Sequence, residues 1–173
     1  MDYLQLLFTT PNPLQTYALV FLLGSLTVSS LSDLKRMAAQ ADFAEVWAAY
    51  TAIMFISDAY LGATGQLNPI TFTIKWAMIL VAAAITTQTR IADISTMDTA
   101  AQTALLATLN PAYIILTITL TILTNELLKP ILQKYGEAGA YPYLPTILTV
   151  NLLILIITQT NTLETATGLT PPA

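Results

Sequence analysis

Three observations predict an all-α, polytopic membrane helix bundle with about six transmembrane helices. Charged residues make up 9% of the 173 residues, against roughly 25% in soluble domains. Apolar residues reach 55% and the mean hydropathy is +0.65. Apolar runs of the length that a helical crossing needs, about 20 residues, recur between interruptions by proline, glycine and charge. We therefore expect one membrane domain over 1–173.

Each predicted span is an apolar run between two interruptions. The first span follows the break at 11–13, and the second ends at the loop 62–69. The fourth is shorter than a full crossing and stops at Asn110-Pro111, and the fifth precedes Lys129-Pro130. The predicted spans are 14–31, 43–61, 70–89, 99–109, 112–128 and 144–158.

Two segments need separate arguments. The stretch ILTITLTIL in the fifth span alternates threonine with isoleucine or leucine, which also suits a strand. A transmembrane barrel needs that alternation in every segment, and the first, third and sixth spans lack it, so we expect a helix. The segment 159–173 is rich in threonine, has two prolines next to its last residue and is almost uncharged, and we expect it to be a flexible tail.

The cations predict the orientation of the bundle. Lys35 and Arg36 follow the first span, Arg90 follows the third, and Lys129 and Lys134 follow the fifth. Five of the six cations thus share one side, which the positive-inside rule predicts to be cytoplasmic. The protein is then expected in the cell membrane, with both termini on the outer side. Lys75 is left near the other end of the third span, where we expect its side chain to reach out towards the headgroups.

The composition also excludes several kinds of chemistry. The chain has no cysteine and no histidine, so disulfides, thiolate nucleophiles, Cys or His zinc sites, haem ligation by His and a Ser-His-Asp triad are excluded. A net charge of -4 has the wrong sign for a nucleic-acid partner. We expect no cofactor and no metal, and any hydrolysis has to use carboxylates, hydroxyls or lysine.

Two carboxylates are the candidate catalytic residues. Asp33 ends the first span and Asp93 precedes the fourth, so the topology puts both at the cytoplasmic boundary of the membrane. Two carboxylates brought together at low dielectric share a proton and divide the acid and base roles, as in an aspartic protease. The simpler interpretation is a loop ion pair between Asp33 and its neighbours Lys35 and Arg36, and the spacing alone leaves both open.

Other carboxylates are assigned weaker roles. Asp42 and Glu45 have the positions of an N-cap and a first turn for the second span, and Asp98 lies five residues after Asp93. All three lie on the cytoplasmic side and are weak candidates for binding a basic substrate segment, with simple solvation as the alternative. Asp58, near the outer end of the second span, is expected at the membrane interface.

Three stretches resemble the type IV prepilin and preflagellin peptidases, a family of aspartic membrane peptidases with a GxGD signature. The stretch SSLSDLKRMAAQADFAEVW resembles the first signature, in which an Asp followed by a basic residue ends a catalytic helix. The stretch RIADISTMDTAAQTALLATLNP resembles the GxGD region, and YPYLPTILTVNLLIL resembles the start of the last helix. Asp33 and Asp93 fall on the two catalytic aspartates. The cysteine-rich insert of many bacterial members is absent, so the chain is nearer the compact archaeal form.

This resemblance implies a membrane endopeptidase that removes the short basic leader of class III signal sequences from pilin-like or archaellin-like precursors. Its partners would be the bilayer and precursors with a hydrophobic N-terminal helix, with a homo-oligomer or a larger membrane complex left open. Where the family has Gly-x-Gly-Asp, this chain has Arg90, Ile91, Ala92 and Asp93. Arginine resists the backbone conformations that glycine permits. The alternative is therefore a catalytically degenerate homologue that acts as a structural subunit.

Overall fold

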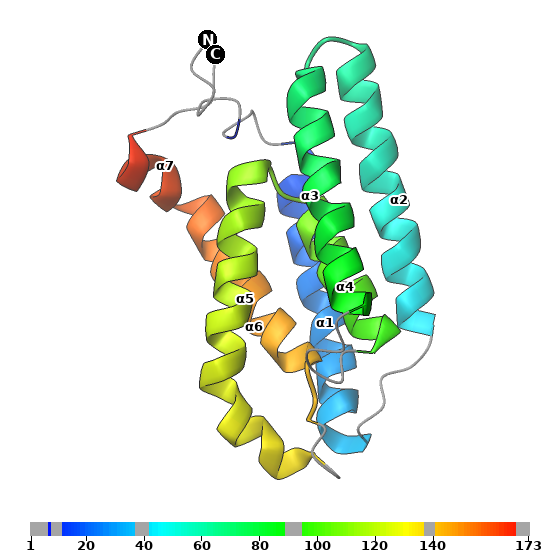
Figure 1. Cartoon of the computed structure of the whole chain (residues 1–173), viewed down its shortest axis with the longest axis vertical. Helices are drawn as coiled ribbons and strands as arrows, with labels where there is room; N and C mark the ends of the chain where they lie inside the picture. The colour runs from blue at the N-terminus through cyan, green and yellow to red at the C-terminus, as the bar shows by residue number, and fades with distance from the viewer. Residues whose placement is uncertain (1–6, 8–11, 37–41, 89–94, 137–140, 169–173) are drawn as a thin grey trace.

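The computed structural model describes residues 7, 12–36, 42–88, 95–136 and 141–168, and within them the chain is all-helical (Figure 1). Four helices are long and apolar enough to cross a membrane, which indicates a multi-pass membrane protein. The helices in chain order are α1 (Gln15–Arg36), α2 (Asp42–Ala63), α3 (Pro69–Gln88), α4 (Thr96–Ala107), α5 (Pro111–Leu132), the 3-10 turn η2 (Gln133–Tyr135), α6 (Leu144–Gln159) and α7 (Thr162–Thr167).

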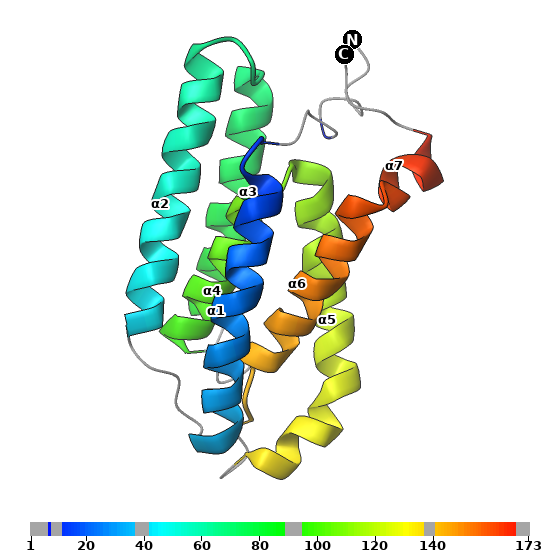
Figure 2. The ribbon, with the colours of Figure 1, turned by 180° about the vertical axis from the view of Figure 1, so that it is seen from behind.

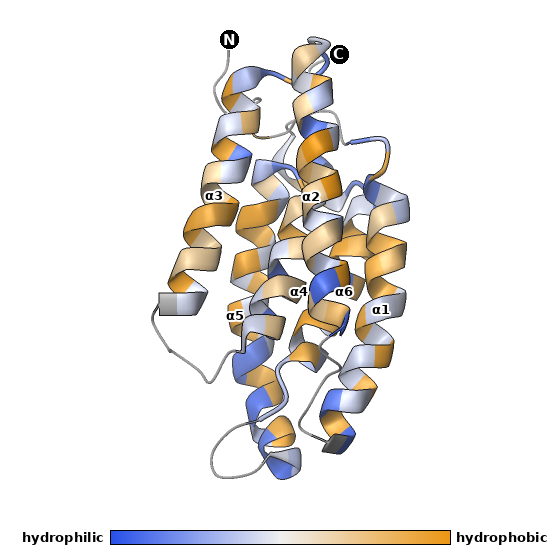
Figure 3. Cartoon of the chain, turned by 90° about the vertical axis from the view of Figure 1, so that its right-hand side faces the viewer, coloured by the Kyte–Doolittle hydropathy of each residue, from blue (hydrophilic) through white to orange (hydrophobic). Residues whose placement is uncertain are grey.

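The outer faces of the long helices are apolar, as expected for helices that contact lipid. Large exposed side chains include Phe21 on α1, Ile56 on α2, Leu80 on α3 and Leu127 on α5. Apolar residues fill the middle of the bundle in Figure 3, and hydrophilic residues gather at the ends of α1 and α5 that point the same way. A soluble protein rarely exposes so much apolar surface, so this pattern supports the membrane assignment.

Helix α4 lies at the centre of the bundle. It packs against α1, α2, α3 and α6, and every residue of 104–114, from its second half into the start of α5, is buried. α4 starts at the N-cap Ser95, and the next helix starts at the N-cap Asn110, whose side chain accepts a hydrogen bond from the Tyr113 amide at 3.1 Å. Pro111 fits the first position of α5 because no intrahelical bond is needed from its nitrogen.

Helices α1 and α6 lie side by side and run in opposite directions (Figure 2). At one end the Leu144 amide, at the start of α6, donates to the Asp33 carboxylate of α1. At the other end the Gln159 side chain donates to the Thr16 hydroxyl at 3.1 Å. The start of α1 and the end of α6 are therefore at the same end of the bundle.

The structure differs most from the sequence expectation at two helix ends. α5 was expected to stop at 128, before Pro130, but it continues to Leu132 with Pro130 inside it. The first helix was expected to end at 31, but α1 continues to Arg36, so Asp33 lies within the helix. Both helices extend beyond the apolar run because their last turns are at the hydrophilic end of the bundle, where water satisfies carbonyl groups.

The segment expected as a flexible tail contains helix α7. Its Glu164 accepts a hydrogen bond from the Tyr113 hydroxyl at 2.7 Å, which ties α7 to the start of α5. Gly168 ends the helix in the left-handed region, with φ of 66°. A glycine at that position costs little because it has no Cβ.

Candidate functional site

Asp33 of α1 has a buried carboxylate that contacts the start of α6. Its side chain is at the end of α1, the residue is 9% exposed, and its Oδ2 accepts the Leu144 amide at 3.4 Å, across 111 residues of sequence. Leu144 is the first residue of α6, where the helix dipole and the free amides favour negative charge. The long-range contact places Asp33 inside the bundle and gives its carboxylate a backbone partner.

Asp98 is held rigidly in the first turn of α4. Its Oδ2 accepts the Ser95 amide at 2.9 Å and the Ser95 hydroxyl at 2.8 Å. The Ser95 hydroxyl in turn accepts the Asp98 amide at 3.2 Å, which completes a capping box. Asp98 is only 7% exposed, so this carboxylate is buried and fixed in orientation.

Asp33 and Asp98 are close enough to influence each other. Asp98 lies outside the four candidate spans, and burial raises its pKa to about 6 against the opposing effect of the Ser95 hydrogen bonds, with the charge of Asp33 adding to the rise. Asp33 and Asp98 thus form an acidic pair between the end of α1 and the start of α4.

The remaining predicted site residues are placed as follows. Asp93 and the substituted signature residue Arg90 lie outside the described residues. Asp42 and Glu45 are in the first turn of α2 and are exposed. Asp98, the third weak candidate for binding a basic segment, is buried, and its capping box turns its carboxylate back onto the helix start.

Several buried polar atoms close to the acidic pair in sequence have no hydrogen-bond partner. Ser29 and Ser30 precede Asp33 by one helical turn on α1, and Gln102 follows Asp98 by one turn on α4. Thr146 is in the first turn of α6, two residues after Leu144. Buried polar atoms are usually paired, so these side chains are available to form hydrogen bonds with water or with a peptide backbone.

A second buried polar site lies at the opposite end of α2 and α3. Asp58 and Lys75 form an ion pair of 2.6 Å and are 2% and 5% exposed. Trp76 Nε1 donates to the same carboxylate oxygen at 3.1 Å, and Asn12 Nδ2 donates to the other oxygen at 3.1 Å. The expectation that Lys75 reaches out to the headgroups is therefore wrong, because a carboxylate within the bundle compensates its charge.

Sequence reasoning missed this pair although a signal was present. A lysine inside a candidate span needs a partner, since an unpaired charge at that depth is expensive. Asp58 is the acidic residue of the preceding span nearest the loop to α3. If the second and third spans are paired as an antiparallel helical hairpin, Asp58 and Lys75 lie at a similar depth in the membrane.

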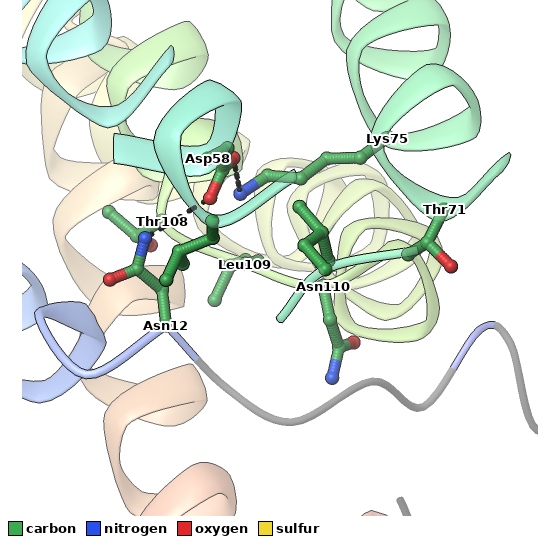
Figure 4. Close-up of a pocket in the computed structure, with 9 residues that line it drawn as sticks. Asn12, Asp58, Thr71, Lys75, Thr108, Leu109 and Asn110 are labelled. Atoms are coloured by element: carbon green, nitrogen blue, oxygen red, sulfur yellow. Dashed lines mark hydrogen bonds and ion pairs between the residues drawn. The ribbon is translucent and has the colours of Figure 1, made fainter. Parts of the chain in front are cut away.

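The Asp58–Lys75 pair borders a cavity, shown in Figure 4. Its volume is about 330 Å³ when the open mouth is counted. The lining residues come from α2, α3, the loop between them, the segment before α1 and the turn between α4 and α5: Asn12, Asp58, Leu61, Leu67, Thr71, Lys75, Thr108, Leu109 and Asn110. Among the described residues, no three Asp or Glu side chains are grouped to hold a metal ion.

Comparison of the chain with protein-family models, with curated proteins and with solved structures finds no match. The assignment of a function thus depends on the residues and on the geometry of the two buried sites.

Proposed function

We propose that this chain is a membrane aspartic endopeptidase that removes short basic leaders from pilin-like or archaellin-like precursors, with Asp33 and Asp93 as the catalytic pair. In this proposal the chain crosses the membrane six times, with the predicted spans 99–109 and 144–158 as the shorter crossings. The ends of α1 and α5 that carry Lys35 and Lys129 face the cytoplasm, and both termini are outside.

The observation that carries the proposal is the burial of Asp33 beside the start of α4. Asp33 is coupled electrostatically to Asp98, and Asp93 precedes the N-cap Ser95 by only two residues in the sequence. The end of α1 and the start of α4 are therefore neighbours, which supports a catalytic pair made of Asp33 and a residue just before α4 in the sequence. The unpaired polar atoms of Ser29, Ser30 and Gln102 supply further groups that can bind water.

The chemistry needs two carboxylates that share one proton. The ionised carboxylate takes a proton from water, which attacks the scissile carbonyl carbon, while the protonated carboxyl gives its proton to the carbonyl oxygen. Asp42 and Glu45 are exposed on the same side and are available to attract a basic leader. Asp98 is buried, so in this proposal it acts on the charge of the catalytic pair and not on the leader.

The test is cleavage of a co-expressed precursor. Asp33→Asn and Asp93→Asn should each lower cleavage by about 10²–10⁴-fold, because an amide cannot exchange the proton that both steps need. Asp98→Asn is the matched control: it removes a neighbouring carboxylate and should leave most of the cleavage. Equal loss in all three variants would point to a general effect of charge and would contradict the proposed pair.

The structural-subunit alternative is favoured by Arg90, which replaces the first glycine of the signature. Arg90→Gly separates the two functions, since glycine restores the freedom of the backbone before Asp93. A large gain of cleavage over an inactive parent would identify a silenced peptidase. An active parent that changes little on substitution would exclude the structural-subunit function.

A further inference from the structure

The cavity beside Lys75 is small and partly open to the outside. It lies where α2, α3 and the turn between α4 and α5 meet, and Asn12 closes one side (Figure 4). The cavity admits a group about the size of one water molecule, and its 330 Å³ includes open solvent at the mouth. A ligand can therefore insert a single small polar group and leave its remainder outside.

Much of the hydrogen-bonding capacity left over in the cavity is that of donors. Both oxygens of Asp58 already accept, one from Asn12 and the other from Lys75 and Trp76. The Lys75 ammonium has three N–H groups, and the described part of the chain gives it one acceptor, Asp58. Asn110 uses its side-chain oxygen for the Tyr113 amide, which leaves its amide N–H groups as donors. The group that fits is thus an acceptor.

The electrostatics favour an acceptor that carries negative charge. α3 begins at Pro69 and α5 begins at Pro111, and residues next to both starts line the cavity, so the positive ends of two long helices meet there. The neutral donors Trp76 and Asn12 also stabilise the Asp58 charge, so this carboxylate does not depend on the ammonium alone.

We propose that this cavity binds the phosphate group of a phospholipid headgroup, with one anionic oxygen accepting from Lys75 Nζ and the rest of the headgroup in the mouth. The exposed apolar faces of the neighbouring helices, with Ile56 on α2 and Ile70 on α3, bring lipid to the cavity. Inorganic phosphate offers the same oxygens, so the experiment separates the two sources. This binding site is independent of the proposed peptidase activity.

The test measures ligand binding to the full chain purified in neutral detergent. Native mass spectrometry and thermal shift are recorded with phosphatidylglycerol, with diacylglycerol and with inorganic phosphate. We expect one tightly bound phosphatidylglycerol and little effect of diacylglycerol, which lacks the phosphate. If inorganic phosphate stabilises the chain as strongly, the phosphate site is supported and its natural source is free phosphate.

Two variants change the binding in opposite directions. Asp58→Asn with Lys75→Met replaces the pair by neutral groups of similar size and should weaken phosphatidylglycerol binding at least about tenfold. Asp58→Asn alone removes the carboxylate that competes for the ammonium and should strengthen it. Lys129→Met, outside the cavity, is the control and should leave binding unchanged. Binding retained in the double variant, weakened by Asp58→Asn alone, or equal for diacylglycerol would overturn the proposal.

Discussion

Asp98 makes the stability of the chain depend on pH in a defined window. Its pKa rises from 3.8 to about 6 in the folded chain, mainly through burial. As the pH rises from about 4 to about 6, the unfolded chain releases this proton while the folded chain keeps it, so the free energy of unfolding falls. Above pH 6 the carboxylate is ionised in both states and the effect is constant.

Asp98→Asn should therefore remove this part of the pH dependence. At pH 7 the variant should be more stable than the parent by on the order of 2 kcal/mol, because the buried charge is gone and the amide oxygen still accepts from Ser95. The measurement is thermal unfolding in detergent between pH 4 and pH 7. Asp42→Asn, at an exposed position, is the control, and an unchanged slope in Asp98→Asn would contradict the assignment.

Lys75 and Asp58 should show strong non-additivity. Lys75→Met leaves Asp58 charged and without its cation inside the bundle, which should cost about 3–5 kcal/mol. The double variant Asp58→Asn, Lys75→Met should cost much less, because no buried charge remains. Unfolding in detergent of the two single variants and the double variant gives the coupling energy. Costs that simply add would mean that the 2.6 Å contact contributes little.

At the scale of the elements, α4 depends on its capping box. Ser95 accepts the Asp98 amide and also gives two donors to the Asp98 carboxylate, so Ser95→Ala removes the cap and leaves part of a buried carboxylate unpaired. We expect a loss of stability of about 1–2 kcal/mol. Thr96→Ala, at the exposed next position, is the comparison and should be close to neutral in the same unfolding experiment.

The helices from α1 to α6 were largely predictable because each contains an apolar run with a recognisable start or stop. The Asn110-Pro111 signal correctly separated α4 from α5. The end of α5 was not predictable in the same way. Proline removes one backbone donor, but near the hydrophilic end of the bundle the freed carbonyl can be satisfied, so the helix continues past Pro130.

The site was predictable only where a single element determines it. That Asp42 and Glu45 begin α2 follows from local sequence, and the acidic first turn is confirmed. The burial of Asp98 follows from its capping box together with the packing of α4 among four helices. The contact between Asp33 and the Leu144 amide joins residues 111 apart, and no local pattern encodes such a distance.

At the scale of the whole molecule, the orientation can be tested because the sequence has no cysteine. Gln66→Cys lies in the exposed turn between α2 and α3, and Gln133→Cys lies in the exposed turn after α5. A membrane-impermeant thiol reagent applied to intact cells should label the first and spare the second until the cells are opened. The reverse result would show the opposite orientation in the membrane, with the acidic pair of Asp33 and Asp98 on the outer side.

The threonines of α5 have a consequence for how the chain is made. In the helix, Thr119 and Thr121 donate their hydroxyls to the carbonyls of Ile115 and Thr117, which hides these polar groups within the helix. The same β-branched stretch, 115–123, is uncharged and free of proline and glycine, which is the signature of a segment that stacks into cross-β fibrils when it meets water unfolded. We therefore expect this stretch to be inserted into the membrane while the chain is still being translated. A chain released into water before insertion would aggregate through this stretch.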